Sequence, residues 1–296
     1  MPGPFLRAIR PHQWVKNLLV FAPLLFTPRV RELAGWGLAG MGFLTFCLAA
    51  SSIYLLNDIV DREEDARHPK KRHRPIASGA LPVPIAIGGL VALLAIAAAV
   101  AWFGIPTPPD QVAFAVWPAS YLVLNLAYSF GLKRVIIVDC MCIALGFQLR
   151  VHAGAAAIGV KTSHWILLCT FFFALFLAFC KRYEELGRQG EASGQTRATM
   201  KDYSVPFLSM MIGPLAALSI LSYSLYTVSP ETIAIHKTEG LMLTVPVVTY
   251  GVFRYLFLVF RKSEGGDPAK LLFSDPPLII AGLLYVGLVL AVLGSR

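Results

Sequence analysis

Residues 57–79 read NDIVDREEDARHPKKRHRPIASG, and more than half of these side chains are acidic, basic or histidine. They follow a run from Trp36 to Leu56 that has no charged residue and is long enough to cross the hydrocarbon core of a bilayer as a helix. A polar segment directly after an apolar span places acidic and basic groups together at one membrane surface. The stretch therefore indicates a membrane protein whose chemistry lies at that surface.

Apolar windows of similar length recur along the chain. Its 296 residues are 56% hydrophobic and 15% charged, with a mean hydropathy of +0.65, whereas a soluble domain of this length would carry more charge. The predicted fold is all-α, a polytopic membrane bundle in which residues 1–296 form a single catalytic domain. About nine transmembrane helices are expected, at 18–33, 36–57, 83–104, 111–131, 135–158, 163–181, 205–228, 240–260 and 277–294. Pro23 and Pro28 interrupt the first window.

Lys and Arg are distributed unevenly between the two sides of the predicted bundle. When loops are assigned alternately to the two sides, nineteen of these residues fall on the side of the N-terminus and five on the other. The positive-inside rule then predicts a multi-pass protein of the inner (cell) membrane, with its N-terminus and its active site on the cytoplasmic side. This basic face suits anionic lipid headgroups and equally a phosphorylated substrate. No nucleic-acid partner is expected.

The acidic residues of the opening stretch are spaced for one helix face. On a helix, Asp58, Asp61 and Asp65 fall at positions i, i+3 and i+7, and Asn57 lies one turn before Asp61. Clustered carboxylates raise one another's pKa unless a cation lies among them. Magnesium prefers hard oxygen ligands from a few carboxylates, water and substrate phosphates. The stripe suits a half-site for Mg²⁺ and a diphosphate, or alternatively a solvated helix end with ordinary neighbours such as Arg62.

A basic cluster follows at once. Lys70, Lys71, Arg72 and Arg74 lie within ten residues of the last aspartate and precede the turn-like segment 75–79. A metal half-site followed by four cations suits a polyanionic ligand. The positive-inside rule accounts for the cations alone.

The pattern Asn57-Asp58-x-x-Asp61-x-x-x-Asp65, followed by Arg74-Pro75-Ile-Ala-Ser-Gly79, resembles the first aspartate motif of the UbiA superfamily of intramembrane prenyltransferases. Six further segments resemble one branch of it, the decaprenyl-phosphate phosphoribosyltransferases: Arg10–Asn17, Tyr128–Arg134, Gly146–Arg150, Lys181–Leu186, Phe253–Leu256 and Gly265–Pro268. The resemblance covers residues 8–280. It implies a nine-helix bundle with a Mg²⁺–diphosphate site that opens to the cytoplasm and to the lipid.

The sequence departs from the superfamily after the sixth span, where ordinary members carry a second aspartate-rich motif. Here the chain reads Lys181-Arg182-Tyr183-Glu184-Glu185, so that two cations precede only two carboxylates. This composition fits a substrate whose phosphates are met partly by Lys and Arg. A basic helix end would explain the two cations but not the two glutamates.

The resemblance implies transfer of 5-phosphoribose from phosphoribosyl diphosphate to a polyprenyl (decaprenyl) phosphate, with release of diphosphate, in the supply of cell-wall arabinan precursors. The protein would then be a Mg²⁺-dependent membrane glycosyltransferase, and a homo-oligomer is compatible with this function. One alternative is a UbiA-type enzyme that moves a prenyl group from its diphosphate to an aromatic or glycerol-phosphate acceptor. A remote alternative is a transporter of phosphorylated lipids, which would need polar groups continuing to the far side of the membrane.

The phosphoribosyltransferase interpretation gives each candidate residue a role. Asp58, Asp61 and Lys133 are expected to be catalytic, and the expected metal ligands are Asn57, Asp58, Asp61 and Asp65. Substrate-binding residues are expected at Lys16, Asn17, Arg72, Arg74, Tyr128, Lys133, Arg134, Lys181, Arg182, Glu185 and Arg254.

Three charged residues inside the apolar windows also need partners. Arg254 is expected about 10 Å from the cytoplasmic end of its helix, and an arginine at that depth usually faces the bundle interior. Asp139 either pairs with a basic neighbour or belongs to the site. Arg150 is expected to extend its guanidinium toward the far surface.

Overall fold

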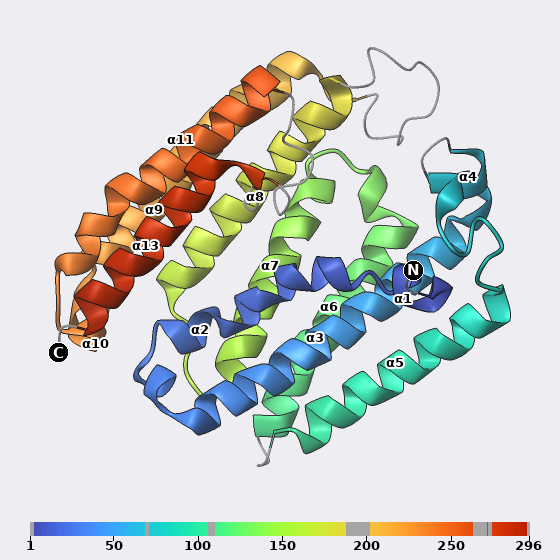
Figure 1. The fold of residues 1–296 in the computed structure, drawn as a ribbon, viewed down its shortest axis with the longest axis horizontal. Helices are drawn as coiled ribbons and strands as arrows, with labels where there is room; N and C mark the ends of the chain where they lie inside the picture. The colour runs from blue at the N-terminus through green and yellow to red at the C-terminus, as the bar shows by residue number, and fades with distance from the viewer. Residues whose placement is uncertain are drawn as a thin grey trace. The chain divides into compact units, whose positions relative to one another are not determined.

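The structure is a computed structural model that describes residues 3–68, 71–105, 110–187, 202–262, 271 and 274–294. Every regular element in these ranges is helical, which confirms the all-α prediction (Figure 1). Seven of the described helices are long and apolar enough to cross a membrane: Leu33–Val60, Val83–Phe103, Gln111–Phe130, Val138–Ala157, His164–Gly187, Val205–Val228 and Gly240–Arg261. A shorter apolar helix covers Pro276–Val292.

The first predicted span is wrong as a single helix. A 3₁₀ segment, Pro11–Phe21, leads into α2 (Ala22–Leu25) and a second 3₁₀ segment, Pro28–Arg31. Proline has no N–H to donate along a helix and fixes its own φ, so it is tolerated at the start of a helical segment and disrupts an interior. Each of these three segments has a proline in its first two positions. The mean hydropathy of a sequence window does not detect such breaks at proline, because it counts only the polarity of the side chains.

The described chain divides into two compact units. Unit 1 contains residues 1–132 and 148–162, and unit 2 contains 133–147 and 163–296. Helix α7 (Val138–Ala157) contributes its first half to unit 2 and its second half to unit 1. The assignment of residues 1–296 to one domain remains a prediction.

Unit 1 is built around α3 (Leu33–Val60). This helix packs along α5 (Val83–Phe103) and also contacts α6 (Asp110–Phe130) and the segment 11–21 (Figure 1). Besides α2 and the second half of α7, this unit contains two short helices, α1 (Pro4–Ala8) and α4 (Arg62–Arg67). One close approach inside the unit requires glycine, because a Cβ at Gly154 would lie 1.9 Å from the carbonyl oxygen of Val20.

Unit 2 is a layer of long helices: α8 (His164–Gly187), α9 (Val205–Val228), α11 (Val245–Lys262) and α13 (Pro276–Gly294). α8 packs on α9, α9 contacts α11, and α11 contacts α13 (Figure 1). The short α10 (Pro230–His236) follows α9. A buried cluster that includes Phe176, Leu208, Ile212 and Leu258 forms the core of this unit.

Candidate functional site

Two of the three aspartates face a common guanidinium in unit 1. Asp58, near the end of α3, and Asp65, in α4, are each 1% exposed. Nη1 of Arg74 donates to Oδ1 of Asp58 at 3.1 Å and to Oδ2 of Asp65 at 2.5 Å. The seven-residue spacing thus brings the two carboxylates to one face, where the guanidinium of Arg74 pairs with both of them.

Asp61 lies between them, at the junction of α3 and α4. Its N–H donates to the carbonyl oxygen of Asn57, and its own carbonyl oxygen accepts from the N–H of Asp65, each at 2.8 Å. Hydrogen bonding four residues apart therefore continues through the junction, although regular helix stops for one residue. Asp61 itself is half-buried.

Arg10 is a second guanidinium on the same carboxylate. Its Nη2 donates to Oδ1 of Asp58 at 2.5 Å, and its guanidinium carbon lies 5.1 Å from the ring centroid of Tyr54. Arg10 precedes Pro11, which disfavours the right-handed helical region for the residue before it, and adopts a φ of +51°. Arg10 was not among the site residues predicted from the sequence. The available signal was its position at the start of the segment Arg10–Asn17.

Two carboxylate oxygens of this cluster accept no hydrogen bond. Oδ2 of Asp58 and Oδ1 of Asp65 are both buried, and the ammonium of Lys71 lies 3.6 Å from the latter. Buried carboxylate oxygens without a donor are costly unless a cation reaches them. The described residues contain no group of three or more acidic, His or Cys side chains placed to hold a metal. A divalent cation here would share two carboxylates with water and substrate phosphates, which is how Mg²⁺ is usually held.

Asn57 is anchored to α6. Its Oδ1 lies 2.5 Å from the hydroxyl oxygen of Ser129, which also lies 2.7 Å from the carbonyl oxygen of Asn125. The single hydroxyl proton can serve only one of these acceptors at a time. Ser129, which is buried, joins the polar end of α3 to the segment Tyr128–Arg134. Sequence reasoning identified that segment but not this contact.

Arg150 is buried inside unit 1, so the expectation that it extends to the far surface is wrong. Its Nε donates to Oδ1 of Asn17 at 2.8 Å, and its Nη2 donates to the hydroxyl of Tyr121 at 3.2 Å. The amide of Asn17, also buried, donates in turn to Sγ of Cys47. A guanidinium within a membrane span is stabilised by such internal acceptors. Asn17, expected to bind substrate, therefore has its amide oxygen and nitrogen engaged in the unit's core.

Arg182 lies at the centre of an ion-pair network in unit 2. Its Nε donates to Oδ2 of Asp139 at 2.7 Å, and its Nη1 donates to Oε2 of Glu185 at 2.5 Å. Arg182 is 1% exposed, and Asp139 is fully buried. Of the two roles left open for Asp139, the structure shows the pairing with a basic residue. Because two carboxylates face Arg182, its charge is largely compensated within the protein.

Arg254 makes a two-pronged pair with Asp275. Its Nε and Nη2 lie 3.1 and 2.9 Å from the two carboxylate oxygens of Asp275. Oδ1 of Asp275 also accepts from the N–H of Leu278, near the start of α13. This pair links α11 to α13, which gives Arg254 a clear structural role.

The other predicted substrate-binding residues differ in exposure. Lys133 and Arg134 belong to a 3₁₀ turn, Leu132–Arg134, between α6 and α7. Arg72 and Arg134 are exposed, whereas Lys16, Tyr128, Lys133 and Lys181 are half-buried. Lys70 and the segment Gly265–Pro268 lie outside the described residues.

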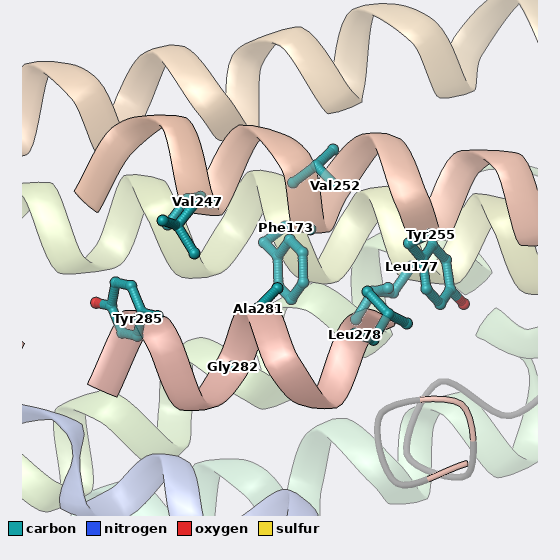
Figure 2. Close-up of a pocket in the computed structure, with 11 residues that line it drawn as sticks. Phe173, Leu177, Val247, Val252, Tyr255, Leu278, Ala281, Gly282 and Tyr285 are labelled. Atoms are coloured by element: carbon teal, nitrogen blue, oxygen red, sulfur yellow. The ribbon is translucent and has the colours of Figure 1, made fainter. Parts of the chain in front are cut away.

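An apolar groove of about 280 Å³ runs along unit 2 between α8, α11 and α13 (Figure 2). Its lining is hydrocarbon apart from tyrosine hydroxyls, and Tyr255 and Tyr285 lie toward its opposite ends in the close-up. Gly251 and Gly282 line it as well, and a Cβ added at either would meet no atom within 4 Å. The two glycines therefore leave space that a larger side chain would occupy.

Comparison with known proteins gives consistent matches. A family model described as the UbiA prenyltransferase family matches residues 19–275. The chain is 34% identical to the decaprenyl-phosphate phosphoribosyltransferase of Corynebacterium glutamicum, over 95% of this chain and 84% of the relative. It is 33% identical to the protein of the same name from Mycolicibacterium smegmatis, over 95% of this chain and 90% of that one. Among solved structures, a UbiA homolog from Archaeoglobus fulgidus bound to GPP and Mg²⁺ matches with a TM-score of 0.70 at 20% identity, covering 99% of this chain and all of that one.

Proposed function

Because this chain belongs to the UbiA prenyltransferase family, we propose that it transfers 5-phosphoribose from phosphoribosyl diphosphate to a polyprenyl phosphate and releases diphosphate. The chain is an integral multi-pass membrane protein and a transferase of the prenyltransferase type. The observation that carries the finer proposal is the near full-length similarity to relatives named decaprenyl-phosphate phosphoribosyltransferase. In such a role the product would feed cell-wall arabinan synthesis.

The proposed chemistry needs little from the protein beyond position and charge. The acceptor phosphate is already an anion at neutral pH, so that it attacks the anomeric carbon without a strong general base. A carbon–oxygen bond forms there as the bond to diphosphate breaks, and diphosphate leaves with its electrons. Catalysis then consists of aligning the two substrates and stabilising charge on the leaving group.

The acidic cluster of unit 1 suits the diphosphate end of this reaction. Asp58 and Asp65 would hold Mg²⁺ through the oxygens that accept no hydrogen bond, with Asp61 and Asn57 nearby in the chain. When bound, Mg²⁺ neutralises charge on the departing diphosphate. Arg74, which bridges the two carboxylates here, would then also be within reach of diphosphate oxygens. A Mg²⁺ requirement is supported by the donor chemistry and by the Mg²⁺ in the Archaeoglobus homolog.

The exposed and half-buried cations suit the remaining phosphates. We assign the phosphates of phosphoribosyl diphosphate first to Lys133 and Arg134, because Arg182 and Arg254 already face carboxylates. The excess of Lys and Arg on one side of the predicted bundle favours a cytoplasmic site and a cytoplasmic N-terminus in the inner membrane.

In the presence of Mg²⁺, purified protein should transfer the label of phosphoribosyl diphosphate to polyprenyl phosphate, which gives a labelled, chloroform-soluble product and free diphosphate. Unlabelled prenyl diphosphate should not compete strongly, because a diphosphate-linked sugar is the proposed donor. If labelled prenyl diphosphate instead transferred its chain to an aromatic or glycerol-phosphate acceptor, the alternative UbiA activity would replace this proposal. Chelation of divalent metal by EDTA should abolish the phosphoribosyl product, and added Mg²⁺ should restore it.

The groove of unit 2 is suited to the isoprenoid tail of the acceptor. It is apolar, and α8 and α11, which line two of its sides, are long enough to span a membrane. Tyr255 in its wall follows Arg254 directly in the chain. Gly282→Phe should fill part of the groove, so that the tail loses the burial of roughly two CH₂ groups. This loss should raise the KM for polyprenyl phosphate about tenfold. The KM for phosphoribosyl diphosphate should not change.

Gly287→Phe is the matched control. Gly287 lies on the same helix, outside the groove lining, and a Cβ there also meets no atom within 4 Å. Equal kinetics for the two variants would contradict the assignment of the tail to this groove.

A further inference from the structure

The segment that carries Lys133 and Arg134 ends in a strained turn. The N–H of Val138 donates to the carbonyl oxygen of Ile136 at 2.8 Å, which closes a three-residue turn around Ile137. Ile137 has a φ of +69°, a region that β-branched residues rarely adopt. Ile137 is 41% exposed, so burial of this residue does not hold the turn. Another contact has to stabilise this backbone conformation.

The hydroxyl of Tyr203 makes that contact. It accepts a hydrogen bond from the N–H of Ile137 at 2.8 Å and donates one to Oδ1 of Asp139 at 2.7 Å. Tyr203 lies just before α9 and is 5% exposed, with its ring near those of Phe179 and Phe207. Burial raises the pKa of this phenol, so its hydroxyl keeps the proton that it donates.

Asp139 is itself held from the other side. Its second carboxylate oxygen accepts from Arg182, and the N–H of Asp139 donates to the carbonyl oxygen of Val135 at 3.1 Å. Tyr203, Asp139 and Arg182 are all buried, and both carboxylate oxygens of Asp139 have a donor. A satisfied buried network of this kind is rigid. It connects α8, the start of α7 and Tyr203, two residues before α9, to one turn.

We infer that Tyr203 is a positioning residue: its hydroxyl fixes the turn at Ile137 and thereby the direction of the preceding loop, which presents Lys133 and Arg134 to a substrate phosphate. This inference rests on the proposed function, in which Lys133 contacts the phosphoribosyl diphosphate. Tyr203 touches no substrate in this role. A purely structural tyrosine would support stability without any dependence on Lys133.

Tyr203→Phe keeps the ring and removes both hydrogen bonds, so it isolates the hydroxyl. We expect kcat/KM for phosphoribosyl diphosphate to fall about 10- to 100-fold, since small displacements of a binding group have effects of this size. The KM for polyprenyl phosphate should not change. Tyr223→Phe is the matched control, because that hydroxyl also has two partners in unit 2, Thr244 and Tyr285, and lies outside the network.

A double-mutant cycle with Lys133→Met separates positioning from stability. If Tyr203 acts through Lys133 and Arg134, the fold-loss in kcat/KM caused by Tyr203→Phe should be smaller in the Lys133→Met background, where only Arg134 is left to displace. The same fold-loss in both backgrounds would overturn the inference, and so would an unchanged kcat/KM in either single variant.

Hydrogen exchange tests, without any enzymatic assay, whether the Tyr203 hydroxyl fixes the turn at Ile137. Tyr203→Phe should speed amide exchange across residues 132–138, and Tyr223→Phe should not. Unchanged exchange in Tyr203→Phe would overturn the inference even if phosphoribosyl transfer is confirmed. Wild-type protein that makes no labelled lipid would instead defeat the proposed function and leave the exchange result to decide the role of Tyr203.

Discussion

Asp58→Asn is expected to reduce phosphoribosyl transfer by about 10³-fold, equivalent to roughly 4 kcal/mol of transition-state stabilisation. The substitution preserves the shape of the side chain but removes an anion that is 1% exposed and has one carboxylate oxygen with no hydrogen-bond donor. A neutral amide is a weaker ligand for Mg²⁺ and presents a donor group where the metal needs oxygen. The measurement is the initial rate of label transfer into the chloroform-soluble product at saturating Mg²⁺.

Folding has to be separated from chemistry in this variant. Asp58 accepts from both Arg10 and Arg74, and removal of one partner from a buried ion pair typically costs about 3–5 kcal/mol of stability. Gel filtration and the thermal midpoint in detergent should therefore accompany the rates. Glu231→Gln, an exposed carboxylate in α10, serves as the control. A folded Asp58→Asn protein with wild-type activity would refute the metal assignment.

Arg74→Ala is expected to show the second large effect, a loss of activity together with a larger stabilisation by Mg²⁺. Activity should fall about 10²-fold, because the guanidinium that would reach the diphosphate is lost. At the same time, Mg²⁺ should raise the thermal midpoint of the variant more than that of the wild type. Without Arg74, the carboxylates of Asp58 and Asp65 lose the cation that they share, and a divalent ion that binds only the folded state can replace it.

Arg62→Ala controls for the general loss of a positive charge, since Arg62 is an exposed residue at the start of α4. It should change neither the activity nor the Mg²⁺ dependence of the thermal midpoint. If Mg²⁺ stabilised Arg74→Ala no more than the wild type, the two carboxylates would not form a cation site.

The sequence correctly predicted that Asp58 and Asp65 share one face, because that prediction needs only helical geometry. Asp58 and Asp65 are seven residues apart, which is two turns, and hydrogen bonding continues across the junction at Asp61. Arg74 was near enough in the chain to be a natural partner. Arg10 was not, since it is 48 residues from Asp58 in the sequence and reaches it only through the path of the segment before α3.

Arg150 shows the reverse case. Its position toward the far end of its span suggested an extended side chain, but Asn17 and Tyr121 supply acceptors from elsewhere in unit 1. Asp139 and Arg182 likewise lie 43 residues apart, and only their packing shows that they neutralise each other. The window at 18–33 was mistaken for a helix because average hydropathy does not count missing N–H donors.

The amino-acid sequence by itself determined that this protein is an all-α membrane protein with an acidic stripe followed by a basic cluster at one helix end. Those properties depend on local composition and on a repeat of 3.6 residues, which neighbouring residues set without help from distant ones. Only the tertiary structure decided which cations remain exposed at the protein surface and which form ion pairs with carboxylates inside the protein. Arg182 pairs with Asp139, and Arg254 pairs with Asp275. The reason is physical: an ion pair forms where the folded chain brings opposite charges within a few ångströms, and separation along the sequence does not set that distance.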